Sequence, residues 1–235
     1  MAEGSLAREY IPVNFRQASE ILIKTYKLEG KPVAISYVDE PVPDGDSKKR
    51  FVCVALQQAR KGMAINLSAE NISCPGGLHW LGLQDQRMIL IPFLTYVEKF
   101  FKDIVVAEKW FNTVPTPPWE RAKFVTLTPL DLAHGEPDLV FLVANTHEAH
   151  RIHTALTYSE GTLTLQNFFA ATCQSSIGIP LVTQKPCIAL PDTASRKFAK
   201  FTDADVVVSL PYQYFVKLLE DIDKSSGGTA VVEFP

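Results

Sequence analysis

The sequence is poor in cysteine and has almost no net charge. Four cysteines occur among 235 residues, at positions 53, 74, 173 and 187, and no two form a CxxC pair. This dispersed spacing argues against a zinc ribbon, a thioredoxin-type motif and a disulfide framework. The 23 basic and 26 acidic residues give a net charge of −3, so no basic excess favours nucleic acid or an anionic membrane as a partner.

Long apolar runs and common catalytic signatures are also missing. The longest strongly apolar run, Met88–Leu94, is far shorter than the roughly 20 residues that span a bilayer. The first fifteen residues do not read as a secretory signal. No Walker loop, GxGxxG, GxSxG or kinase signature is present, which argues against nucleotide-dependent enzymes and serine hydrolases. We therefore expect a cytoplasmic protein with reduced thiols.

The hydrophobic pattern predicts a mixed α/β (α+β) fold in a single domain spanning residues 1–235. We expect helices at Arg16–Leu28, Phe51–Lys61, Thr146–Thr157 with Thr146 as the N-cap, and 211–224, and helical tendency at Phe93–Phe101 and Ile104–Phe111. We expect strands at Pro32–Val38, Met63–Leu67, Lys123–Thr128, Leu139–Ala144, 162–166, Cys187–Leu190, Val206–Leu210 and Ala230–Phe234, and a basic turn at 193–200. The aromatic stretch Phe93–Phe111 is expected to be core, with an oligomer interface as the alternative.

Two stretches of the chain follow a similar order of elements. Each has a strand, a helix containing Ala-Leu, a glycine, a second strand and a cysteine turn, and Gly62 precedes Cys74 by the same 12 residues as Gly161 precedes Cys173. Internal duplication of 16–128 and 137–223 would pack two strand-helix-strand halves around a pseudo-twofold axis. Chance matching is the alternative, because identity between the halves is low.

The most unusual string is Ser73-Cys74-Pro75-Gly76-Gly77. Proline suits the first turn of a helix, so Ser73 or Cys74 is expected at the N-cap, where backbone N–H groups would lower the pKa of the thiol. Gly76 and Gly77 would permit close approach of a ligand. We interpret Cys74 as a reactive thiol or a metal ligand, with a buried filler residue in a tight turn as the alternative.

The other cysteines carry weaker signals. Cys173 is surrounded by small residues, which favours core packing, although it remains a candidate metal ligand with Cys74. Cys53 and Cys187 look like buried apolar positions and receive no functional assignment. Thiolates from separate parts of the chain would have to meet in space to hold iron-sulfur or zinc.

Two polar segments are further candidates. Ser195 and Arg196, followed by Lys197 and Lys200, could hold a carboxylate or phosphate, or could form a solvated loop. The histidines of HEAHRIH at 147–153 are three apart, but HExxH is absent. A solvated helix face is therefore favoured over a metal site.

The sequence resembles the uncharacterised ArCR family, DUF169. The resemblance lies in an ordered series of segments, PVAISY, FVCVALQQARKG, NISCPGGLHWLGL, ATCQSSIGIP, LPDTASR and VVVSLPYQYF. The resemblance covers roughly Ile21–Leu219 and implies a single-domain bacterial or archaeal cytoplasmic protein, without supplying an activity. It extends to Cys74, Gly76, Gly77, Cys173 and Arg196 as candidate site positions. Members often carry a further cysteine or a glycine-rich turn where this chain has LPDTA before Ser-Arg, which counts against a multi-cysteine cluster here.

These observations leave two functional hypotheses. The first is a cofactor- or metal-handling redox protein with a thiol-lined pocket between its halves, an iron-sulfur cluster or another metal being the candidate cofactor. Cys74 would be the ligand or reactive thiol, and Arg196 would pair with an anionic group. The second is a non-catalytic binder of a small anionic metabolite, or an accessory protein, in which Cys74 only packs. A homo-oligomer is compatible with both.

Overall fold

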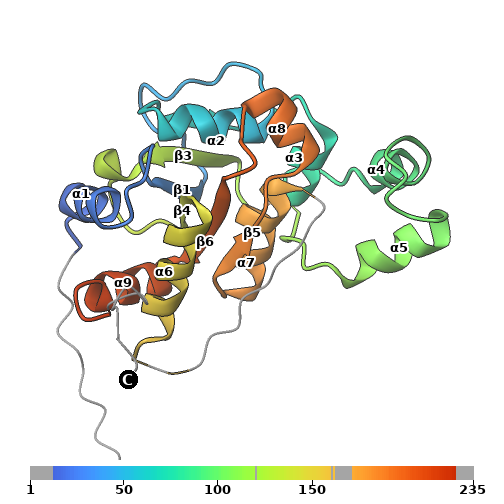
Figure 1. Ribbon diagram of the computed structural model, residues 1–235. Coiled ribbons are helices and arrows are strands. Elements are labelled where there is room, and N and C mark those ends of the chain that lie inside the picture. The colour runs from blue at the N-terminus through green and yellow to red at the C-terminus, as the bar shows by residue number, and fades with distance from the viewer. Residues whose placement is uncertain (1–12, 120, 160, 162–170, 226–235) are drawn as a thin grey trace, which may run out of the picture.

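The computed structural model describes residues 13–119, 121–159, 161 and 171–225, and within them a six-stranded sheet forms the centre of the molecule (Figure 1). The strand order is β2-β3-β1-β4-β6-β5, and every pairing is antiparallel. The strands are β1 (Val33–Val38), β2 (Ile65–Leu67), β3 (Phe124–Pro129), β4 (Leu139–Ala144), β5 (Cys187–Ala189) and β6 (Val206–Pro211). This architecture confirms the mixed α/β, single-domain prediction.

Helices cover both faces of the sheet (Figure 1). One face carries α2 (Val52–Arg60), α3 (Pro75–Trp80), the π-helix η3 (Gln174–Gly178), α7 (Ile179–Thr183) and α8 (Thr193–Ala199). The other face carries α1 (Phe15–Thr25), the 3₁₀ turn η2 (Leu130–Leu132), α6 (Thr146–Thr157) and α9 (Tyr212–Asp221).

Successive side chains along a strand pack alternately into the two cores. Val33 and Ile35 of β1 belong to the α2 side, whereas Ala34 between them belongs to the α1 side. Successive side chains of a strand point to opposite faces, so a strand covered on both faces can be buried at every position. This explains why the continuous apolar run LVFLVA is buried throughout as β4, as its pattern predicts.

A helical arm extends from the main body on the side of α3 (Figure 1). It consists of α4 (Arg87–Pro92), the π-helix η1 (Phe93–Val97) and α5 (Ile104–Thr113). Phe111 and Leu94 are buried, but Tyr96 and Val105 are 64% and 74% exposed. The expectation that this aromatic stretch is core is therefore wrong for much of it, because a thin arm has too little volume to enclose both faces of its helices.

Several element boundaries differ from the predictions. The predicted helix Thr146–Thr157 is confirmed as α6, but Asn145 is its N-cap and accepts a hydrogen bond from the Glu148 N–H. The expected basic turn at 193–200 is instead helix α8, which begins there because the Asp192 carboxylate caps the Ser195 N–H. The expected strands at 162–166 and Ala230–Phe234 lie outside the described residues.

The sheet has a pseudo-twofold arrangement. Exchanging β1, β2 and β3 for β4, β5 and β6 gives the same strand order read from the opposite edge of the sheet. In each half the first strand also begins opposite a proline, since Val33 pairs with Pro129 and Leu139 pairs with Pro211. The helices do not follow this relation, since α2 and α6 belong to different cores. Internal duplication is not confirmed and stays a prediction.

Across the described part of the chain, every helix is too short or too polar to span a bilayer.

Candidate functional site

Three cysteines from distant parts of the chain lie near one another on the α2 side of the sheet. Cys53 lies on α2, Cys74 directly precedes α3, and Cys173 directly precedes η3; all three join the same core cluster. Their charges are coupled, because ionised Cys74 raises the pKa of both other thiols. We call Cys53, Cys74 and Cys173 the thiol cluster. Cys53 and Cys74 come from the predicted first half and Cys173 from the second.

Local sequence fixes Cys74 at the start of α3. It is the N-cap, with extended backbone, and Pro75 occupies the first helical position, as the sequence predicts. Gly77 is pressed against the turn, since a Cβ there would lie 2.6 Å from Val52 Cγ2 and 2.8 Å from Cys74 Sγ. Gly77 therefore serves the contact between α2 and α3 rather than leaving space for a ligand. Gly76 is less crowded, with Trp80 at 3.8 Å.

Burial controls the protonation of the thiol cluster. It raises the pKa of Cys74, raises that of Cys53 to about 11, and raises that of Cys173 well above its ordinary value. The expectation of a low pKa for Cys74 is therefore wrong: backbone N–H groups of Val52 and Gly77 favour its thiolate, but desolvation outweighs them. Cys74 is half-buried, whereas Cys53 and Cys173 are about nine-tenths buried.

A hydrogen-bonded network borders the thiol cluster. The Asp192 carboxylate accepts from the Thr172 N–H at 2.6 Å and the Ser195 N–H at 2.8 Å, and the Ser195 hydroxyl donates to Thr172 Oγ1 at 2.7 Å. This network ties the start of α8 to the start of η3. The Asp192 charge raises the pKa of all three thiols, and a hydrogen bond with Ser195 lowers that of Cys53. Ser195 is thus buried and helps to hold the start of α8 against the start of η3.

Gln174 is an unpaired polar group beside the cluster. It follows Cys173 in η3, its side chain is fully buried, and among the described residues neither its amide oxygen nor its amide nitrogen has a hydrogen-bond partner. A buried amide without partners costs on the order of 1–3 kcal/mol, and short π-helices frequently occur at functional sites. Gln174 therefore marks this region as one where the fold is not optimised for stability alone.

Arg196 does not face the thiols as a free anion-binding group. Its Nε donates to the Pro191 carbonyl oxygen at 3.0 Å, and its guanidinium pairs with Asp203. Of the predicted site positions, the structure brings Cys74, Cys173 and Ser195 near one another. It places Arg196 on α8, in contact with Pro191 just before that helix and Asp203 just after it.

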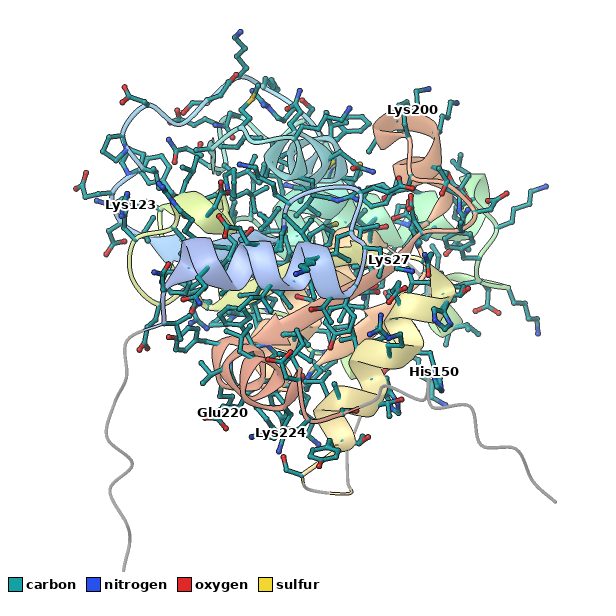
Figure 2. The ribbon with its side chains drawn as sticks, turned by 60° about the vertical axis from the view of Figure 1, so that its left-hand side comes forward. Lys27, Lys123, His150, Lys200, Glu220 and Lys224 are labelled. Carbon is teal, nitrogen blue, oxygen red and sulfur yellow. The ribbon has the colours of Figure 1, made fainter. Side chains whose placement is uncertain are left out.

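The remaining metal candidates stay apart. His147 and His150 are exposed on α6, and Figure 2 shows His150 on the outer side of that helix, which agrees with a solvated face. Cys187 lies on β5, where burial raises its pKa to about 12. Among the described residues, no group of three or more His, Cys, Asp or Glu side chains is arranged to hold a metal ion.

Sequence reasoning missed Cys53, Asp192 and Gln174. Cys53 sits within an apolar helical stretch, and a cysteine there looks like any buried residue. Asp192 could be recognised as an N-cap from its spacing to Ser195, but its proximity to the thiols depends on how η3 packs against α8. No local pattern signals an unpaired Gln174.

Two cavities are open to small molecules. One, of about 370 Å³, is lined by residues at the ends of α2 and α8, and the other, of about 660 Å³, lies between α4 and α5. Cys74 lines neither of them. Neither of these two cavities is the predicted thiol-lined pocket.

Comparison with known proteins places this chain among uncharacterised relatives. The profile of the family described as uncharacterised ArCR, DUF169, matches residues 21–221. An uncharacterised protein of Methanocaldococcus jannaschii is 24% identical over 220 residues, which cover 88% of this chain and 93% of the relative. No solved structure matches the chain.

Proposed function

The chain belongs to the uncharacterised ArCR family, and from its thiol cluster we propose that it is a thiol-based redox protein whose reactive group is Cys74. The observation that carries this proposal is the proximity of Cys53, Cys74 and Cys173 from three separate segments. Neighbouring thiols can pass between dithiol and disulfide, and a reducing compartment such as the cytoplasm would return the disulfide to the dithiol.

Cys74 is the thiol best placed to react first. It is the most accessible of the three, since Cys53 and Cys173 are about nine-tenths buried, so an oxidant reaches its sulfur first. Backbone N–H groups at the start of α3 support its thiolate. The thiolate is the nucleophilic form, so reaction begins at this sulfur and speeds up as pH rises toward its elevated pKa.

The proposed reaction uses a hydroperoxide as the oxidant. The Cys74 thiolate attacks one peroxide oxygen, an S–O bond forms, the O–O bond breaks and hydroxide leaves, which produces a sulfenic acid. A second thiol, Cys173 or Cys53, then attacks the Cys74 sulfur, an S–S bond forms and water leaves. The two sulfurs supply the two electrons that reduce the peroxide.

Peroxide titration tests this proposal. Reduced protein is treated anaerobically with one equivalent of hydrogen peroxide, and remaining thiols are counted by mass after alkylation. We expect two of the four thiols to disappear, expect no such loss in Cys74→Ser, and expect Cys187→Ser to behave as wild type. Equal oxidation of wild type and Cys74→Ser would contradict the proposal.

Metal analysis of the same anaerobic sample separates the redox proposal from metal handling. We expect substoichiometric iron, zinc and sulfide. Stoichiometric metal that is lost in Cys74→Ser would keep Cys74 as a ligand and overturn disulfide exchange as its function.

A further inference from the structure

The cavity of about 370 Å³ has a lining of mixed charge that the thiol proposal does not use. It lies where the turn after α1, the end of α2 and the loop between α8 and β6 come together. Its lining residues are Glu29, Gly30, Gln57, Arg60, Lys61, Ala199, Lys200, Thr202 and Asp205. Its volume falls within the range of roughly 300–1,000 Å³ that small-molecule sites occupy.

Arg60 is a buried cation that forms no ion pair within the described part of the chain. It is only 9% exposed, its Nη1 donates to Gln57 Oε1, and its Nε has no partner among those residues. Gly30 lies against the guanidinium, since a Cβ there would come within 3.1 Å of Nε. Burial is the largest influence on Arg60 and lowers its pKa. A buried charge without an opposite charge in contact is costly, so an incoming anionic group would relieve that cost.

The other charged residues that line the cavity include both cations and anions. Lys61 and Lys200 add positive charge beside Arg60, and Figure 2 shows Lys200 at the outer end of α8. Glu29 and Asp205 add negative charge, and both favour the charged form of Arg60 from beyond ion-pair distance. Asp205 is held in place by the Thr202 N–H, which donates to its carboxylate at 2.6 Å.

From this lining we propose that the cavity binds a small zwitterion of the amino-acid class. Its carboxylate would pair with Arg60 and Lys200, and its ammonium group would pair with Asp205 or Glu29. A phosphate or a dicarboxylate would be repelled by the two carboxylates, and a metal cation by the three basic groups. Gln57 and Thr202 supply hydrogen-bonding groups for a polar side chain.

Matched ligands test the carboxylate contact and the ammonium contact separately. Calorimetry compares L-glutamine with glutaramate, which lacks the ammonium group, with γ-aminobutyramide, which lacks the carboxylate, and with inorganic phosphate. We expect glutamine to bind, and each of the other three to bind at least about tenfold more weakly, a difference of about 1.4 kcal/mol. No glutamine binding at millimolar concentration, or tighter binding of phosphate, would overturn the proposal.

Lys200 is exposed and Asp205 is partly exposed, so variants at both positions should fold normally. Lys200→Gln should weaken glutamine and glutaramate alike, whereas Asp205→Asn should weaken glutamine and leave glutaramate unchanged or improved. Lys197→Gln is the control, because Lys197 is exposed on α8 but does not line the cavity. Equal affinity in the Lys200 and Lys197 variants would contradict the assigned site. Cys74→Ser should bind glutamine as wild type does, so this test is independent of the redox proposal.

Discussion

Replacing Gly77 with alanine should lower the free energy of unfolding, although alanine is the better helix former. The new methyl group would meet Val52 Cγ2 at 2.6 Å, Cys74 Sγ at 2.8 Å and Ile72 Cγ2 at 3.0 Å. Val52 and Ile72 are buried and have little room to move. Overpacking of this kind costs about 1–3 kcal/mol, and helix propensity returns at most about 1 kcal/mol. With that full return, the expected net loss is up to about 2 kcal/mol.

Gly76 provides a matched control one residue away in the same helix. A methyl group there would have its nearest neighbour, a Trp80 atom, at 3.8 Å, which is an ordinary contact. Gly76→Ala should therefore leave stability unchanged or raise it by up to about 1 kcal/mol.

Urea unfolding followed by tryptophan fluorescence measures both variants against wild type. Equal slopes of free energy against urea would show that the difference lies in stability. Equal stability of the two alanine variants would refute the claim that Gly77 is required for close packing of α2 on α3. In that case the glycine pair would have to be explained by something other than packing.

Three further predictions concern buried polar groups on the α2 side of the sheet. Burial lowers the pKa of His79 from 6.5 to about 4, while Asp85 opposes this shift. The unfolded chain therefore binds a proton at His79 more readily than the folded protein does. As a result, the contribution of neutral His79 to the free energy of unfolding is complete above pH 6.5 and falls as the pH drops toward 4. The loss should reach about 3 kcal/mol, and unfolding measured from pH 7 to 4 should show a smaller loss in His79→Leu. Asp192→Asn keeps a capping side chain but removes the charge that raises the pKa of all three clustered thiols; alkylation of Cys74 at pH 8 should become faster, and an unchanged rate would contradict the coupling. Gln174→Met removes a buried amide without partners and should stabilise the reduced protein by about 1 kcal/mol; a loss of stability in thermal unfolding would show that the amide is satisfied in solution.

The fold was predictable where local pattern decides structure. The α6 helix and the buried strand β4 follow directly from periodicity, and Pro75 marks the start of α3. The antiparallel strand order was not predictable, since apolar runs such as LVFLVA do not reveal which neighbours a strand will have. The exposed residues of the α4–α5 arm were misjudged because composition does not report whether a segment packs on the main body.

The candidate site was predictable only in part. The CPGG string correctly indicates a helix that begins at Pro75, but it left the N-cap open between Ser73 and Cys74, and the structure shows Cys74 there. The pKa of Cys74 could not be inferred from that motif, because desolvation by the surrounding core outweighs the backbone N–H groups. The approach of Cys53 and Cys173 depends on packing between segments more than a hundred residues apart, for which no sequence spacing is diagnostic.

Peptide mapping of the oxidised protein shows directly whether Cys74 forms a disulfide within the thiol cluster. Reduced protein is exposed to one equivalent of hydrogen peroxide, remaining thiols are blocked, and disulfide-linked peptides are identified by mass spectrometry. We expect the Cys74 peptide to be joined to the peptide of Cys53 or Cys173, with Cys187 still reduced. A free Cys74 thiol beside oxidised partners, or a link from Cys74 to Cys187, would contradict this expectation.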